Sequence, residues 1–347
     1  MSLKFVILLF FVFLNTQSFA KSAQHQELTF LDTAHESISE TVIDISDSID
    51  DGLNYFAEER DTTQVFIDDN SADSFFQNKK FLEETDNAYV RIRTNYLIQS
   101  KESTDHDINV RASVPLSKTR KSLKLFIESF DDDEMNEMTT QNANDMDFSS
   151  APTVGVSYFS PKTYGIKSKY RLGIRNTQPY VQARYNKVYE SGRWKIEPVQ
   201  SFVYSTKNDF SEETNLYCDK NLGDRSLFRV QLQRGTQSHL DGMNYGLGLS
   251  YYRTIDNRTG LNFSQSFSGN TKYRHVTNDA TTPATLSNTY AGLNNYVTAV
   301  NWRQNVWKKW FYYEVRPSVN FARQYDYKAN YSLLVNLDFY FGRFGKR

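Results

Sequence analysis

Charged side chains recur at every second position in several stretches of this chain, and this spacing is the first feature that points to chemistry. In 165–175 basic residues alternate with apolar ones, and in 331–341 Asp338 stands between Leu337 and Phe339. Successive side chains of a β-strand point to opposite faces, so these stretches predict strands with one polar and one apolar face. The charged residues of the polar faces are Arg91, Arg93, Arg111, Glu128, Lys167, Lys169, Arg171, Arg175, Glu197, Arg229, Glu314, Arg316 and Asp338.

The number of mid-strand charges limits what these polar faces can contact. The core of a soluble β-sandwich could not desolvate so many charged groups, whereas the water-filled lumen of a transmembrane β-barrel could hydrate them. Many alternating stretches also reach the roughly 9 to 11 residues that a membrane-spanning strand needs. The sequence therefore favours a barrel whose apolar face meets lipid and whose lumen is lined by the charged set. If Asp338 faces such a hydrated lumen, Asp338→Asn should leave folding nearly intact.

The charged set is mainly basic, and rings of basic residues in a pore select anions. We therefore expect passive or gated passage of small, anionic solutes. A second interpretation stays open, because facing Arg and carboxylate side chains can also pair across a narrow barrel and close it. The chain would then be a structural or surface-binding barrel without an open pore.

Candidate catalytic residues are few. The three histidines of the strand-rich region, His106, His239 and His275, all fall in stretches expected to be outer loops. His239 with Ser238 and Asp241 has the residue types of a hydrolase site at the rim of a barrel. The stretch SHLDGMN lacks the His-x-Ser spacing of outer-membrane phospholipases, so we expect a non-enzyme and keep a hydrolase near His239 as an alternative.

Neither a metal, another cofactor nor nucleic acid is expected as a ligand. No Cys or His cluster has metal-ligand spacing, and the acidic stretch DDDEMNEMTTQNANDMD lacks the glycine and spacing of an EF-hand. No glycine-rich phosphate loop is present. The basic residues follow strand alternation instead of forming a patch with stacking aromatic residues, which argues against nucleic-acid binding.

The first 20 residues have the pattern of a cleaved secretory signal peptide. Lys4 precedes the apolar stretch FVILLFFVFL, and small residues lie at the cleavage position around Ala20. This stretch is too short to span a membrane, and no later apolar run approaches the length of about 20 residues that a spanning helix requires. Cys218 is the only cysteine, which excludes an internal disulfide.

Residues 21–87 form an acidic segment, with 17 Asp and Glu against four Lys and Arg, or about −13, whereas residues 88–347 carry 24 against 35, or about +11. Within the segment Ile38, Val42, Ile45 and Ile49 recur at spacings of three and four, which predicts an acidic helix with one apolar stripe. We expect an acidic, partly helical periplasmic extension. It could be a solvated extension, or its charge could draw it to a basic lumen as a plug or docking element.

From residue 88 to the end the alternation predicts an all-β, antiparallel up-and-down barrel. The expected strands are 88–97, 107–116, 122–130, 153–160, 165–175, 179–186, 193–205, 212–219, 226–234, 244–253, 260–268, 293–303, 310–322 and 330–341. This gives 14 strands, with 12 as the alternative because the stretches at 179 and 212 are weak. Long connections at 131–152 and 269–292 would lie on the outer side and short ones on the inner side.

These features together resemble the bacterial outer-membrane β-barrel proteins, with porin-like members nearest in size. The resemblance covers residues 88–347, and the C-terminal stretch NLDFYFGRF is similar to the aromatic-ended signal by which the barrel-assembly machinery recognises such proteins. It departs from that signal because Gly345, Lys346 and Arg347 follow Phe344. The resemblance implies a Gram-negative outer-membrane location and contact with outer-membrane lipid and lipopolysaccharide. Solute and oligomeric state stay open.

Overall fold

The computed structural model describes residues 30–54, 75–76, 88–116, 123–129, 152–175, 177–206, 209–238, 242–276, 286–306, 308 and 310–342. The expected signal peptide, the acidic stretch 131–147, His239 and the residues after Gly342 lie outside them. Among the described residues, no helix combines the length and the apolar character needed to cross a membrane.

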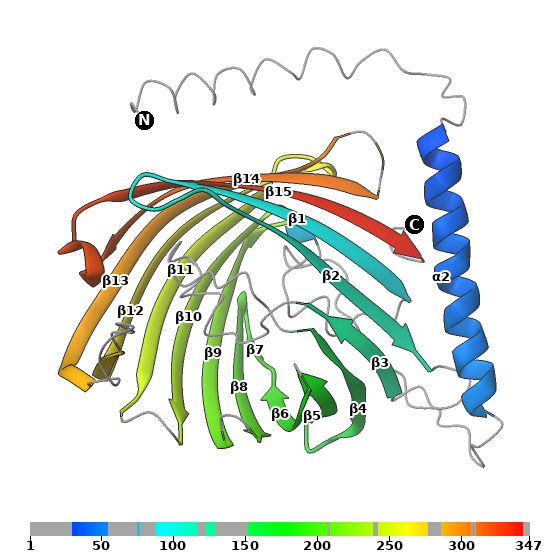
Figure 1. Ribbon diagram of the computed structural model, residues 1–347, viewed down its shortest axis with the longest axis horizontal. Coiled ribbons are helices and arrows are strands. Elements are labelled where there is room, and N and C mark those ends of the chain that lie inside the picture. The colour runs from blue at the N-terminus through cyan, green and yellow to red at the C-terminus, as the bar shows by residue number, and fades with distance from the viewer. Residues whose placement is uncertain are drawn as a thin grey trace, which may run out of the picture.

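The strands form one closed antiparallel sheet in which each strand pairs with its neighbours in sequence (Figure 1). The closure is made by β1 and β15, since β1 pairs along its full length with residues 332–342 of β15. The strands are β1 (Tyr89–Gln99), β2 (Asp105–Pro115), β3 (Leu123–Glu128), β4 (Thr153–Thr163), β5 (Ile166–Arg175), β6 (Gln178–Lys187), β7 (Tyr189–Ser191), β8 (Trp194–Ser205), β9 (Asp209–Gly223), β10 (Ser226–Gln237), β11 (Asn244–Thr254), β12 (Thr259–Val276), β13 (Leu286–Asn305), β14 (Phe311–Ala322) and β15 (Asn330–Gly342).

Strands β6 and β7 both pair with β8, and only Val188 separates them, so they are one interrupted strand. The 15 labelled strands therefore make an up-and-down barrel of 14. This confirms the predicted fold and strand number. The alternative of 12 strands is wrong, because the weak stretches at 179 and 212 belong to β6 and β9.

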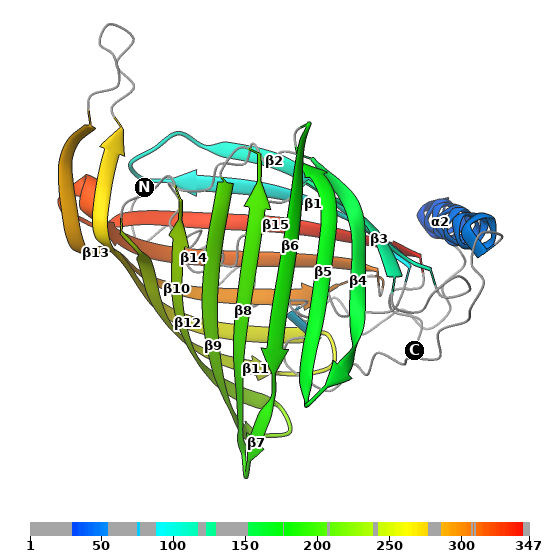
Figure 2. The ribbon, with the colours of Figure 1, turned by 90° about the horizontal axis from the view of Figure 1, so that it is seen from below.

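The strands are strongly tilted. In Figure 2, β4 to β9 on the near side run almost at right angles to β1, β14 and β15 on the far side. Closure of a sheet into a barrel requires such a tilt.

The two faces of each strand differ as the alternation predicts. On β15, Asn336 and Asp338 are buried on the inner face, whereas Tyr331 and Leu337 are exposed on the outer face. Leu334 and Tyr340 break the apolar–polar alternation, and the structure places both among the buried inward residues. The apolar outer face is the surface that a transmembrane barrel presents to lipid.

We define the inner rim as the end of the barrel where β1 begins and β15 ends, and the outer rim as the opposite end. The β4–β5 hairpin at the inner rim is tight: Tyr164 and Gly165 alone connect the two strands, and both have positive φ angles, as a two-residue hairpin turn requires. The long connection expected at 269–292 is wrong in its bounds, because β12 continues to Val276 and β13 begins at Leu286. The predictions that His106 and His275 lie in outer loops are also wrong, because His106 lies in β2 and His275 lies in β12.

Helix α2 (Phe30–Asn54) belongs to the acidic segment and lies outside the barrel. It crosses the inner rim beside the ends of the strands (Figure 1) and contacts β15, β1 and β2.

Candidate functional site

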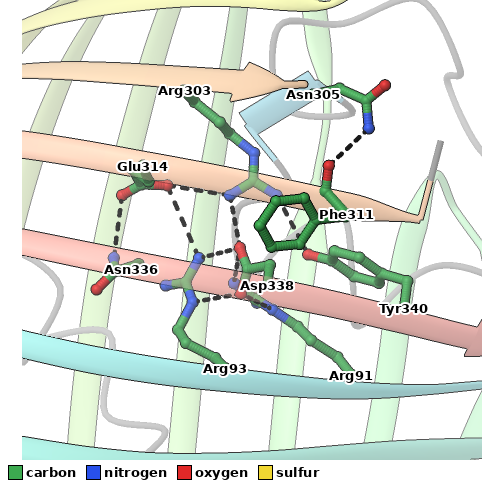
Figure 3. Close-up of polar contacts among 9 residues, drawn as sticks. All are labelled: Arg91, Arg93, Arg303, Asn305, Phe311, Glu314, Asn336, Asp338 and Tyr340. Carbon is green, nitrogen blue, oxygen red and sulfur yellow. Dashed lines mark hydrogen bonds and ion pairs between the residues drawn. The ribbon is translucent and has the colours of Figure 1, made fainter. Parts of the chain in front are cut away.

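The lumen wall carries a buried cluster of five charged residues, which we call the Asp338 cluster (Figure 3). It consists of Arg91, Arg93, Arg303, Glu314 and Asp338. Asp338 accepts hydrogen bonds from the three arginines: from Arg91 Nε at 2.9 Å, from Arg93 Nε at 2.7 Å and from Arg303 Nη1 at 2.8 Å. Glu314 accepts from Arg303 Nη1 at 3.0 Å and lies 3.8 Å from Arg93 Nη2.

Strand register brings these residues together. Arg93 lies opposite Asp338 in the β1–β15 pair, and Arg303 lies opposite Glu314 in the β13–β14 pair. Because all four strands are adjacent around the wall, alternation then places every member on the same face. Asn336 donates to Glu314 at 3.4 Å, and Arg303 Nη2 donates to the Tyr340 hydroxyl at 3.3 Å.

The Asp338 cluster is removed from bulk solvent. The side chain of Asp338 is 1% exposed and that of Arg303 is 0% exposed. Burial of charges at this level requires close pairing, because an unpaired ion would lose its hydration without compensation. Three guanidinium groups face two carboxylates, so the cluster retains one net positive charge.

A second cluster joins Arg111 of β2, Glu128 of β3 and Arg171 of β5. Glu128 Oε1 lies 3.3 Å from Arg111 Nη2 and 2.8 Å from Arg171 Nη2, and the Arg171 guanidinium also lies 3.9 Å from the centre of the Phe126 ring. Two arginines again face one carboxylate. This cluster also carries one net positive charge.

A third site pairs Arg229 of β10 with Asp219 of β9. Both guanidinium nitrogens involved, Nε and Nη2, lie 2.7 Å from a carboxylate oxygen, which is the bidentate geometry of a strong ion pair. Here the charges balance.

Between described residues, the ion pairs found in these three clusters run along the wall. Each joins adjacent strands or strands separated by one, as in Arg93–Glu314 between β1 and β14 and Arg171–Glu128 between β5 and β3. Pairs of this kind brace the wall without spanning the lumen. Among the described members of the three clusters, six arginines face four carboxylates, so these clusters give the wall an excess of positive charge.

The other predicted residues lie on the same inward face. Lys167, Lys169 and Arg175 alternate with exposed outward residues on β5, and Arg316 shares its face of β14 with Glu314. The Lys169 ammonium lies 5.4 Å from the centre of the Phe159 ring, and the Arg175 guanidinium lies 5.4 Å from that of Tyr180.

Glu197 is buried and accepts a hydrogen bond from Asn186 Nδ2 at 2.6 Å. Thus the charged residues singled out from the sequence all lie on the inward faces of their strands.

Sequence reasoning missed Arg303 and Asp219. Arg303 follows Asn295, Val297 and Ala299 on the inward face of β13, all of them buried. Because Val297 and Ala299 are apolar, this inward face lacks the polar character that identifies the inward faces of the other strands. Its residues nevertheless follow the same spacing of two. Asp219 was missed because the stretch at 212 has no clear apolar partner face.

Two aromatic residues of the acidic segment, Phe75 and Phe76, lie inside the barrel near the inner rim. Phe76 packs with Leu227 and Tyr252 on the inward faces of β10 and β11. A Cβ atom added at Gly260 of β12 would lie 2.4 Å from Phe75 Cε1, so the ring fills the space that the glycine leaves. This contact is aromatic and apolar, whereas the sequence predicted attraction between opposite charges.

The expected rim residues His239 and Asp241 lie outside the described residues. The described neighbour Ser238 donates its hydroxyl to the Phe210 carbonyl at 2.9 Å. Within the described part of the chain, no group of three or more His, Cys, Asp or Glu residues is arranged to hold a metal ion.

Comparison with known proteins gives structural neighbours only. No family model matches the chain, and no curated protein sequence matches it. An anion-selective porin from Comamonas acidovorans is 10% identical, with 73% of this chain and 98% of the porin covered and a TM-score of 0.44. The outer membrane channel DcaP of Acinetobacter baumannii is 9% identical, with 74% and 96% covered and a TM-score of 0.42.

The KdgM porin, solved in complex with disordered oligogalacturonate, is 11% identical, with 72% of this chain and 98% of that chain covered and a TM-score of 0.35. These scores are too low to transfer a ligand or an activity. The closed 14-stranded barrel, with its apolar exterior and charged interior, has the architecture of a transmembrane β-barrel.

Proposed function

We propose that this protein is an outer-membrane channel for passage of small anionic solutes. One observation carries the proposal: the buried ion pairs of the lumen brace neighbouring strands, and six arginines face four carboxylates. A wall of this kind leaves the lumen net basic, and basic pore linings favour anions.

The experiment compares two arginines of the same strand in planar bilayers under a potassium chloride gradient. Arg229 faces the lumen, whereas Arg234 lies on the outer face with its side chain 50% exposed. Arg229→Gln leaves Asp219 without its counter-charge and should shift the reversal potential toward cation preference. Arg234→Gln is the matched control and should leave it unchanged. Equal reversal potentials for both variants would contradict the proposal.

We infer in addition that the Phe75–Phe76 pair narrows the channel at its inner mouth. Support comes from the packing of both rings against Leu227, Tyr252 and Gly260 inside the barrel. Replacing both phenylalanines with alanine should raise the single-channel conductance. Phe263→Ala, on the outer face of β12 and 46% exposed, is the matched control. An unchanged conductance in the double variant would leave the acidic segment as an extension without a gating role.

The compartment and the partners follow as part of the same proposal. Residues 1–20 would direct export and be removed, and residues 21–87 would begin on the periplasmic side, next to the inner rim. The outer rim would then face lipopolysaccharide, and β15 would be the strand that the barrel-assembly machinery recognises. Cleavage after Ala20 is checked by the mass of the mature protein.

A further inference from the structure

Helix α2 docks on the barrel with a polar side and leaves Ile38 and Ile45 of its apolar stripe exposed. Asp32, Ser39, Ser46 and Asp50 are 2% to 9% exposed. In contrast, Ile38 is 47% exposed and Ile45 is 53% exposed. A helix held by the hydrophobic effect alone would bury the isoleucines against the barrel and expose the polar residues.

Specific polar and aromatic contacts hold the helix at the inner rim. Lys308 Nζ lies 2.6 Å from Asp32 Oδ2, and His35 Nε2 donates a hydrogen bond to the Tyr340 carbonyl at 2.7 Å. The His35 ring stacks on Trp310 at 4.4 Å and on Phe341 at 5.1 Å between ring centres. Phe341 belongs to the outward face of β15, so α2 lies against the outside of the wall.

Helix α2 lies at the same level as a group of aromatic residues near the inner rim: Trp310, Phe311 and Phe339. Trp310 and Phe339 approach within 6.4 Å, and Phe311 lies 5.0 Å from Phe339 between ring centres. Indole and phenyl groups in this position mark the boundary between hydrocarbon and headgroups. The axis of α2 crosses the end of β15 in Figure 1, and the helix is seen almost end-on in Figure 2. It therefore runs along the rim and not along the strands.

Helical geometry divides α2 into three sides. At 100° per residue, Ile38, Val42, Ile45 and Ile49 form a stripe about a quarter turn from the buried side. The acidic residues Glu36, Glu40, Asp47 and Asp51 lie about a quarter turn away in the opposite direction. A helix with one side on the wall, one apolar side and one charged side fits the plane between lipid and water.

We propose that the apolar stripe of α2 inserts among the acyl chains of the membrane leaflet that surrounds the inner rim. The stripe adjoins the lipid-facing surface of the barrel, because His35, which lies between the buried side and the stripe, stacks on Phe341 and Trp310 of that surface. Phospholipid is thus the neighbour that already covers the adjoining wall. A second copy of this acidic helix would instead bring like charges together.

The charge of α2 sets it apart from most interfacial helices, whose polar faces are rich in Lys and Arg. Its acidic side cannot attract anionic headgroups. The contacts of Asp32 and His35 with the barrel supply the attachment that basic residues supply elsewhere. Insertion should therefore take place in zwitterionic phosphatidylcholine vesicles, without anionic lipid.

The test places an environment-sensitive fluorophore on each side of the helix. In a Cys218→Ser background of the full chain, Ile45→Cys and the matched control Glu40→Cys are labelled and refolded into phosphatidylcholine vesicles. Brominated acyl chains should quench the label at position 45 at least twofold and shift its emission to the blue. They should leave the label at position 40 unchanged.

Two further arms keep the proposal falsifiable. A label at Ile38→Cys probes the stripe at a second point, in case the variant at position 45 refolds poorly. A label that is blue-shifted without quenching by brominated lipid, and whose shift disappears at low protein-to-lipid ratio, would mean that a second copy covers the stripe. That result, or equal quenching at positions 40 and 45, overturns the proposal.

Discussion

Asp338→Asn is the substitution that probes the lumen wall most sharply. The carboxylate accepts five hydrogen bonds from three arginines, at 2.7 to 3.1 Å. An amide has the same shape, but its nitrogen is a donor and would face guanidinium donors. The substitution also raises the net charge of the Asp338 cluster from one to two.

The cost follows from burial. Removing one partner of a buried ion pair costs about 3 to 5 kcal/mol, because the remaining charge is left uncompensated. Glu314 still neutralises part of the charge on Arg93 and Arg303, so we expect the lower end, about 3 kcal/mol. From the sequence we expected Asp338→Asn to be nearly neutral, because a hydrated lumen would solvate the carboxylate. The Asp338 side chain is only 1% exposed, so we now expect the substitution to be destabilising.

The assay is urea-induced unfolding of the protein refolded into lipid vesicles, with the free energy of unfolding as the measured quantity. Asp326→Asn is the matched control, because the Asp326 side chain is 86% exposed and its pair with Lys328 lies at the surface, where such pairs contribute about 0 to 1 kcal/mol. Arg93→Gln in the Asp338→Asn background should recover part of the loss. If Asp338→Asn and the control cost the same, the cluster is hydrated and the reasoning from burial fails.

Three further predictions concern the wall and the inner mouth. Val335→Arg, on the outer face near the middle of β15, should lower the free energy of unfolding in vesicles by about 2 to 4 kcal/mol relative to Val335→Leu, and equal free energies for these two variants would refute the assigned facing. Gly260→Ala should displace the Phe75 ring and raise single-channel conductance, and a conductance equal to that of the unaltered protein would mean that Phe75 is not seated there. Glu128→Gln should strengthen anion preference, since it removes the carboxylate between Arg111 and Arg171; a shift of the reversal potential in the other direction would contradict a net basic lumen.

Local alternation was enough to predict the strands, because a barrel strand repeats its inward and outward positions every two residues wherever it lies. It also placed Arg93, Glu314 and Asp338 on one side before any pairing was known. The pairing itself depends on register, which alternation does not contain: Arg91 lies opposite Tyr340, and it reaches Asp338 diagonally. Whether the charges line or cross the lumen was therefore beyond the sequence.

The acidic segment shows a second limit of sequence reasoning. The stripe of Ile38, Val42, Ile45 and Ile49 predicted an amphipathic helix, and α2 covers it. The side of α2 that meets the barrel is polar, however, because Asp32 pairs with Lys308 and His35 stacks on Trp310. Lys308 and Trp310 are distant in sequence from the helix, so this choice of side could not be predicted. Similarly, the seat of Phe75 depends on the missing side chain of Gly260, a fit that only the folded barrel reveals.

The central claim is an open lumen whose wall is net basic, and the reversal potential of the unaltered protein tests it most directly. Purified protein is inserted into a planar bilayer with a potassium chloride gradient, and insertion is verified independently. The proposed function predicts discrete conducting steps and a reversal potential on the side of chloride. Verified insertion without conductance, or a reversal potential on the side of potassium, would contradict the account.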